Sequence, residues 1–168
     1  MLAAACSVAL HGARSAAAEP PSGTASGLPL PRFVSLKSDR VNVRAGPSRD
    51  HDVLWVFTRA GLPVEITAEF ENWRRIRDWE GAEGWVYHTL LSGKRTALVS
   101  PQAKSGHDLL PLYEKADGHA AIAAKLQSGV LGSVRRCDSG WCRVQGQGFD
   151  GWIEQARLWG VYPNERLE

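Results

Sequence analysis

The fold is decided by two short stretches, Trp73-Arg74-Arg75-Ile76 and Gly84-Trp85-Val86, which recur as Trp141-Cys142-Arg143-Val144 and Gly151-Trp152-Ile153. The first pair is separated by 68 positions and the second by 67, so one residue is missing between them in the second copy. Chance is a poor explanation for these matches, because the chain has only seven tryptophans among 168 residues. The repeat is longer than the roughly 20 to 50 residues of solenoids and propellers, and it therefore predicts a pair of domains.

The apolar residues between these landmarks follow the two-residue period of β-strands. In the first copy the pattern predicts short strands around residues 41–43, 53–57 and 64–66, separated by Gly and Pro residues. Glu71-Asn72 predicts a tight turn before Trp73, and no apolar stripe is long enough for a substantial helix. We therefore expect an all-β protein of two tandem small barrels, over residues 32–100 and 101–168.

The segment before the barrels has two different compositions. Residues 1–18 are small and apolar and end in Ala16-Ala17-Ala18, which predicts a signal peptide cleaved before Glu19, although a disordered Ala-rich tail of a cytoplasmic protein is the alternative. Residues 19–31 are rich in Pro and Gly and predict a disordered linker. No stretch has the roughly 18 apolar residues of a membrane span, so no stable membrane insertion is expected after cleavage.

Four segments of the first copy together resemble the bacterial Src-homology-3 (SH3) domain. They are Val41-Asn42-Val43-Arg44-Ala45-Gly46-Pro47-Ser48, Arg59-Ala60-Gly61-Leu62-Pro63-Val64, Asn72-Trp73-Arg74-Arg75-Ile76 and Glu83-Gly84-Trp85-Val86. The second copy is similar through its two Trp motifs, but Leu109-Leu110-Pro111-Leu112 replaces the opening strand and the Gly-Pro turn is absent. The resemblance covers about residues 32–163. It implies barrels of five or six strands, an extracytoplasmic location, and association with peptidoglycan or cell-wall enzymes.

Charge and residue spacing exclude several classes of function. The net charge is +2, and neither copy has the basic stripe of a nucleic-acid-binding protein. The scattered histidines and cysteines do not match the spacing of a zinc site, so no metal and no cofactor is expected. A catalytic Cys with His107 or His119 has little support, because Arg74 aligns with Cys142. The chain is therefore predicted to be non-enzymatic.

Two cysteines belong to the second copy alone. Cys137 and Cys142 flank Asp138-Ser139-Gly140-Trp141, a predicted hairpin turn that brings them across from one another. In an exported protein this pair predicts a disulfide. The closed loop is short, so the bond should contribute only about 2 kcal/mol by the chain-entropy estimate.

The aromatic residues give the candidate binding surface. Trp85 and Trp152 are expected in the barrel cores, whereas Trp73 and Trp141 fit either the core or a surface platform. Trp55 and Trp79 belong to the first copy only, and they fit either an exposed patch with Tyr87 or a cover over one barrel end. The predicted ligand-binding residues are Trp55, Trp73, Arg75, Arg77, Trp79 and Tyr87, because Arg and Trp together bind carboxylates and apolar stems of a peptide.

Two functions follow from these expectations. The first is a periplasmic or secreted binding protein of the cell envelope, which recognises peptidoglycan or a peptide through the first barrel. The alternative is an adaptor for another exported protein, such as a cell-wall hydrolase.

Overall fold

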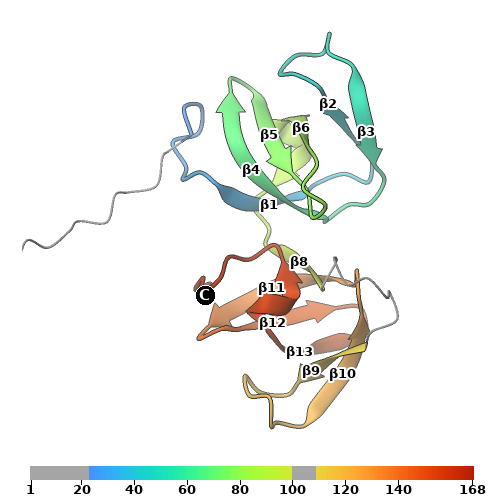
Figure 1. The fold of residues 1–168 in the computed structure, drawn as a ribbon, viewed down its shortest axis with the longest axis vertical. Coiled ribbons are helices and arrows are strands. Elements are labelled where there is room, and N and C mark those ends of the chain that lie inside the picture. Colours follow the sequence, from blue (N-terminus) through green and yellow to red (C-terminus); the bar gives the residue numbers. More distant parts are fainter. Residues whose placement is uncertain (1–22, 100–108) are drawn as a thin grey trace, which may run out of the picture.

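The computed structural model describes residues 23–99 and 109–168, which form two seven-stranded sheets with two short 3-10 helices. The predicted signal peptide lies outside the described residues, as do residues 19–22 of the predicted linker. Figure 1 shows the two sheets curled into separate barrels that lie one above the other, with the C-terminal segment at their junction.

The first barrel contains strands β1 to β7 in the order β3-β2-β6-β5-β4-β1-β7. Its elements are β1 (Arg32–Leu36), β2 (Val41–Arg44), β3 (Val53–Phe57), β4 (Pro63–Phe70), β5 (Trp73–Arg77), β6 (Glu83–Tyr87), η1 (His88–Leu90) and β7 (Leu91–Ser92). The predicted turn at Glu71 and Asn72 is present, because Phe70 pairs with Trp73 across it.

The second barrel repeats this arrangement in the order β10-β9-β13-β12-β11-β8-β14. Its elements are β8 (Thr96–Val99), β9 (Leu109–Tyr113), β10 (Ile122–Gln127), β11 (Leu131–Asp138), β12 (Trp141–Gly146), β13 (Phe149–Glu154), η2 (Gln155–Arg157) and β14 (Leu158–Trp159). Each strand of one barrel has a counterpart at the same place in the other, so the all-β fold of two tandem SH3-like barrels is confirmed.

Two details differ from the expectation. Each sheet has seven strands instead of five or six, and the last of each, β7 and β14, has only two residues. The segment Thr96–Val99, which the sequence assigned to the first barrel, pairs with β11 and opens the second sheet as β8. The junction between the barrels therefore lies just before Thr96, several residues earlier than residue 100.

The expectation that Trp85 and Trp152 fill the barrel cores is wrong. Along β6 and β13 the buried residues are the glycine before each Trp and the β-branched residue after it, so the indoles are half-buried on the outer face. The glycines are required for close approach of two strands: a Cβ on Gly84 would lie 2.4 Å from Val43 Cγ1, and one on Gly151 would lie 2.7 Å from the Tyr113 carbonyl oxygen. The repeated motif thus keeps Gly inside and Trp outside.

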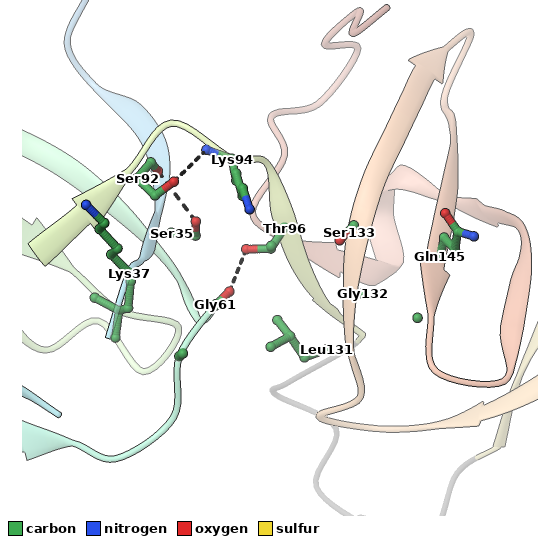
Figure 2. Close-up of a pocket in the computed structure, with 13 residues that line it drawn as sticks. Ser35, Lys37, Gly61, Ser92, Lys94, Thr96, Leu131, Gly132, Ser133 and Gln145 are labelled. Carbon is green, nitrogen blue, oxygen red and sulfur yellow. Dashed lines mark hydrogen bonds between the residues drawn. The ribbon is translucent and has the colours of Figure 1, made fainter. Parts of the chain in front are cut away.

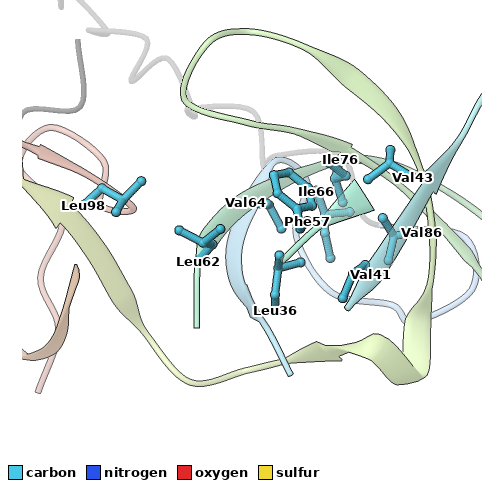
Figure 3. Packing of buried hydrophobic residues seen from close by; sticks show 10 residues of the cluster. All are labelled: Leu36, Val41, Val43, Phe57, Leu62, Val64, Ile66, Ile76, Val86 and Leu98. Carbon is cyan, nitrogen blue, oxygen red and sulfur yellow. The ribbon is translucent and has the colours of Figure 1, made fainter. Parts of the chain in front are cut away.

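Each barrel has its own apolar core, and the first core also includes residues of the second barrel. Figure 3 shows the first cluster, which gathers residues from β1 to β6 and also includes Leu98 from β8 of the second barrel. Leu131 and Trp159, also from the second barrel, pack against this cluster. Burial of apolar residues from both barrels in one cluster favours two docked barrels over two barrels that move independently.

Polar and aromatic contacts fix the docking. The Phe33 ring of β1 contacts the rings of both Trp159 and Tyr162, with centroids 5.1 Å and 4.7 Å away. Trp159 Nε1 donates to the Pro63 carbonyl oxygen at 3.2 Å, and the Tyr162 hydroxyl donates to Glu65 Oε1 at 2.8 Å. Burial and the nearby Glu65 carboxylate raise the pKa of Tyr162, which keeps its hydroxyl a donor.

The predicted disulfide between Cys137 and Cys142 is confirmed. The two cysteines are direct partners across the β11–β12 hairpin, with Cα atoms 4.1 Å apart. Both side chains are buried in the second core. The bond therefore joins the hairpin to the interior of its barrel.

Part of the predicted linker is held against the first barrel, so the expectation of disorder over residues 19–31 does not extend to its second half. The backbone N–H groups of Ala25 and Ser26 and the Ser26 hydroxyl donate to the carboxylate of Glu69. Arg32 Nη2 donates to the same carboxylate at 2.6 Å, and Arg74 Nε lies 3.2 Å from it. Desolvation alone would raise the pKa of Glu69, but the hydrogen bonds from Arg32 and Ser26 outweigh it and lower the pKa to about 2.

Among the described residues there is no helix whose length and apolar character suit a membrane crossing.

Candidate binding groove

The outer face of β5 and β6 carries the aromatic residues of the candidate site. Trp73 pairs with Tyr87 across the two strands, and their rings meet edge to face with centroids 5.4 Å apart. The two-residue period of the strands puts Arg75 opposite Trp85 on this same face. Trp73 is only 8% exposed, so of the two alternatives for this residue the structure shows a buried indole that still lines a surface groove.

This groove lies between the strand β2 and the aromatic pair and has a volume of about 360 Å³. We call it the arginine–aromatic groove. It is lined by Arg40, Asn42, Arg44, Arg49, Trp73, Tyr87, Thr89 and Leu90. Three arginines and two aromatic rings are thus brought together from segments that are distant in the sequence.

The turn between β2 and β3 is held in place by one of these arginines. Arg44 Nη1 donates to the carbonyl oxygens of Arg49 and His51, at 3.0 Å and 2.7 Å. The Ser48 hydroxyl accepts a hydrogen bond from the Asp50 N–H at 3.1 Å. Arg44 and Ser48 therefore satisfy backbone groups of the turn, and the turn they hold presents Arg49 to the groove.

The groove is cationic. None of its lining residues is acidic, and within residues 23–99 and 109–168 neither Arg40 nor Arg49 forms an ion pair. The Arg49 guanidinium lies 5.9 Å from the Tyr87 ring centroid, within the range of a cation–π contact. A guanidinium fork above an aromatic floor suits a ligand that has both a carboxylate and an apolar stem.

Two predicted ligand-binding arginines are already paired within the barrel. Arg75 forms an ion pair with Glu83, and Arg77 forms one with Glu65. Glu65 is buried and also accepts the Tyr162 hydrogen bond, so Arg77 belongs to the contact between the barrels. The structure therefore places Trp73 and Tyr87 in the groove but Arg75 and Arg77 outside it.

Trp55 and Trp79 lie outside the arginine–aromatic groove. Both rings contact the ring of Phe57, with centroids 6.0 Å and 6.1 Å away, and both indoles pack against the first core. Trp55 Nε1 is buried and has no hydrogen-bond partner among the described residues. Of the two alternatives for these residues, the arrangement favours a cover over one end of the barrel, apart from Tyr87.

The second barrel has a different groove at the same place. Tyr113 pairs with Trp152 as Arg44 pairs with Trp85, so Tyr113 occupies the position of Arg44. Trp141 pairs with Glu154 as Trp73 pairs with Tyr87, so a carboxylate replaces the phenol ring. The small pocket there, about 130 Å³, is lined by Glu154 and Arg157 among others and lacks the cluster of three arginines.

Sequence reasoning missed the other six groove residues, Arg40, Asn42, Arg44, Arg49, Thr89 and Leu90. The signal was present in part, because the alternating pattern of β2 puts Asn42 and Arg44 on the face opposite the buried Val41 and Val43.

No group of three or more metal-ligating side chains occurs among the residues that the structure describes.

Comparison with known proteins gives one family. The model of the bacterial SH3 domain family matches residues 37–93 and 106–160, one match in each barrel. The curated protein "Putative N-acetylmuramoyl-L-alanine amidase YrvJ" of Bacillus subtilis is 22% identical over 125 residues, which are 67% of this chain and 24% of that protein. The chain therefore spans about a quarter of the length of this relative.

Two solved structures are also similar, NlpC1 and NlpC2 from Trichomonas vaginalis. Their sequence identities are 12% and 13%, and their TM-scores are 0.35 and 0.36. The matches cover 82% and 76% of this chain but only 48% and 47% of those chains.

Proposed function

The chain belongs to the bacterial SH3 domain family, and we propose from that premise that it is a non-enzymatic binding protein of the cell envelope. Its ligand is a peptide that carries carboxylates, such as the stem peptide of peptidoglycan. The ligand binds in the arginine–aromatic groove of the first barrel, and the second barrel supports the first.

One observation carries this proposal, namely the unpaired arginines beside an aromatic pair. Arg40 and Arg49 are exposed and line the groove without an acidic neighbour in its wall. Trp73 and Tyr87 give a rigid apolar floor at small cost in side-chain entropy. Guanidinium groups bind the carboxylates of such a peptide, and the rings pack against its aliphatic parts.

An extracytoplasmic location is part of the proposal. It is supported by the Cys137–Cys142 disulfide, because such bonds persist in oxidising compartments. It is also supported by the Ala-rich segment at residues 1–18 and by the similarity to a relative named as an amidase of N-acetylmuramoyl-L-alanine.

A second candidate function is that of an adaptor for another exported protein. It is favoured by the outermost strand of the first sheet, β3, where Val53, Leu54 and Val56 are 42%, 52% and 36% exposed. An edge strand with exposed apolar residues is suited to pairing with a strand of a partner.

The proposal is tested by co-sedimentation of the mature chain with purified peptidoglycan sacculi. We expect Arg49→Gln to weaken binding about fivefold to tenfold, because interfacial arginines are common hot spots. The matched control is Arg59→Gln, which removes the same charge from an exposed site of the same barrel outside the groove.

Equal binding by the wild type and both variants contradicts the groove as the site. If the wild type does not sediment with sacculi and instead captures one dominant protein from an envelope extract, the adaptor function replaces the first proposal.

A further inference from the structure

A second cavity lies between the two barrels, and none of the residues that line it also lines the arginine–aromatic groove. It has a volume of about 450 Å³, within the range of small-molecule sites. We call it the inter-barrel cleft. It is lined by Ser35, Leu36, Lys37, Ala60, Gly61, Ser92, Lys94, Thr96, Leu131, Gly132, Ser133, Gln145 and Gly146. Figure 2 shows that residues of β1 and the first barrel's loops face residues of β11 and β12 across it.

The walls of the cleft are held at a fixed distance by the docking of the barrels. The Thr96 hydroxyl donates to the Gly61 carbonyl oxygen at 2.7 Å, directly at the cleft (Figure 2). A Cβ on Gly61 would lie 3.3 Å from a methyl group of Leu131, so the two barrels are in close contact there. Because of these contacts, the cleft is a preformed cavity.

The chemistry of the lining is cationic and rich in hydroxyl groups. Lys37 and Lys94 are exposed, and within the described parts of the chain their ammonium groups form no ion pair. No acidic residue lines the cleft. Ser35 is only 2% exposed, and its hydroxyl donates to the Ser92 carbonyl oxygen at 3.4 Å, so it belongs to the fixed wall of the cavity.

These groups match one class of ligand. Ammonium groups bind a carboxylate or phosphate, while side-chain hydroxyls and the Gln145 amide bind sugar hydroxyls. Leu131, which is half-buried, gives apolar surface against which the C–H face of a sugar ring can pack. We propose that the inter-barrel cleft is a second ligand site, which binds an acidic saccharide independently of the groove.

The test is an NMR titration of the full chain with two matched pairs of sugars. N-acetylmuramic acid differs from N-acetylglucosamine by a carboxylate-bearing group, and glucose 6-phosphate differs from glucose by a phosphate. We expect the acidic member of at least one pair to shift the amide signals of Gly61, Thr96 and Gly132, and to bind at least about fivefold more tightly than its neutral partner. The pair that responds identifies the anionic group.

Variants locate the site. The double variant Lys37→Gln/Lys94→Gln should lose about tenfold in affinity for the acidic sugar, and the loss should shrink at high salt. The control Lys125→Gln removes an exposed lysine from β10, outside the cleft, and should bind as the wild type does. Arg49→Gln should also bind the sugar normally, which separates this site from the proposed groove.

Three outcomes overturn the proposal. They are the absence of saturable shifts with both acidic sugars, equal shifts with acidic and neutral sugars, and equal affinity in the double variant and Lys125→Gln. None of these outcomes bears on sacculus binding through Arg49, so the two proposals fail separately.

Discussion

Arg44 and Tyr113 occupy the same position in the two barrels, each opposite the Trp of a Gly-Trp motif. This difference between the two residues is one reason why the two grooves differ in charge. Arg44 holds the turn that presents Arg49 to the groove, whereas in the second barrel Glu154 also replaces Tyr87. A groove with three arginines thus has a counterpart that contains a carboxylate. Because the exchanged side chains all lie on the surface, the two barrels keep the same fold while their surfaces differ in charge.

Glu69 gives a prediction for the pH dependence of stability. Its pKa is lowered from 4.5 to about 2, so the carboxylate stabilises the folded state above pH 4.5, and this contribution is lost as the pH falls from about 4.5 to about 2. The shift corresponds to at most about 3 kcal/mol. We expect the free energy of unfolding, measured by urea titration, to fall through this pH range.

The matched variant is Glu69→Gln, which keeps the shape of the side chain but cannot titrate. It should be less stable than the wild type at pH 7, and it should lose less stability between pH 4.5 and pH 2. Parallel pH profiles for the two proteins would show that Glu69 does not hold residues 25–32 through its charge.

The β11–β12 hairpin carries the Cys137–Cys142 disulfide, which has no counterpart in the first barrel. Its two cysteines close a loop with a sequence separation of 5, and both are buried in the core. The double variant Cys137→Ala/Cys142→Ala should lower the free energy of unfolding by about 2 kcal/mol through loop entropy, with a further loss from the vacated volume. Chemical denaturation with and without a reductant measures both parts.

The reductant is the internal control for this element. It should destabilise the wild type and leave the double variant unchanged. A wild type that is indifferent to reduction would contradict a stabilising role for the bond.

Most strands were predictable from the sequence because their apolar residues alternate over a half-buried sheet. Val41 and Val43 are fully buried as the two-residue period requires, and Asn42 between them is exposed. The orientation of Trp85 was not predictable from its size and repetition. The decisive fact is the close approach of Val43 to Gly84, a contact between strands that are distant in the sequence.

The candidate site was predictable only in part, for a similar reason. Trp73 and Tyr87 were identified because they are aromatic, and they do line the groove. Arg75 and Arg77 were predicted because they are neighbours of Trp79 in the sequence, but cross-strand glutamates pair with them. Arg40 and Arg49 reach the groove from the residue just before β2 and from the turn after it, and no local pattern shows which strand β2 pairs with.

In the whole molecule the two barrels are docked, and the second barrel contributes both to the contact between them and to the inter-barrel cleft. Its C-terminal residues Trp159 and Tyr162 both contact the ring of Phe33 in the first barrel, and these contacts hold the two barrels together. The same docking creates the inter-barrel cleft, which neither barrel forms alone. In this account the first barrel binds the peptide, and the pair of barrels binds the saccharide.

The central claim, that the groove of the first barrel binds and its counterpart does not, is tested most directly by the indole N–H signals of Trp73 and Trp141. These residues occupy equivalent positions and serve as an internal comparison in one sample. The chain is titrated with soluble peptidoglycan fragments that keep their stem peptides, and the two signals are assigned from Trp73→Phe and Trp141→Phe. The account predicts a saturable shift of the Trp73 signal, with the Trp141 signal unchanged. A shift of Trp141 alone, or no shift of either signal, would contradict it.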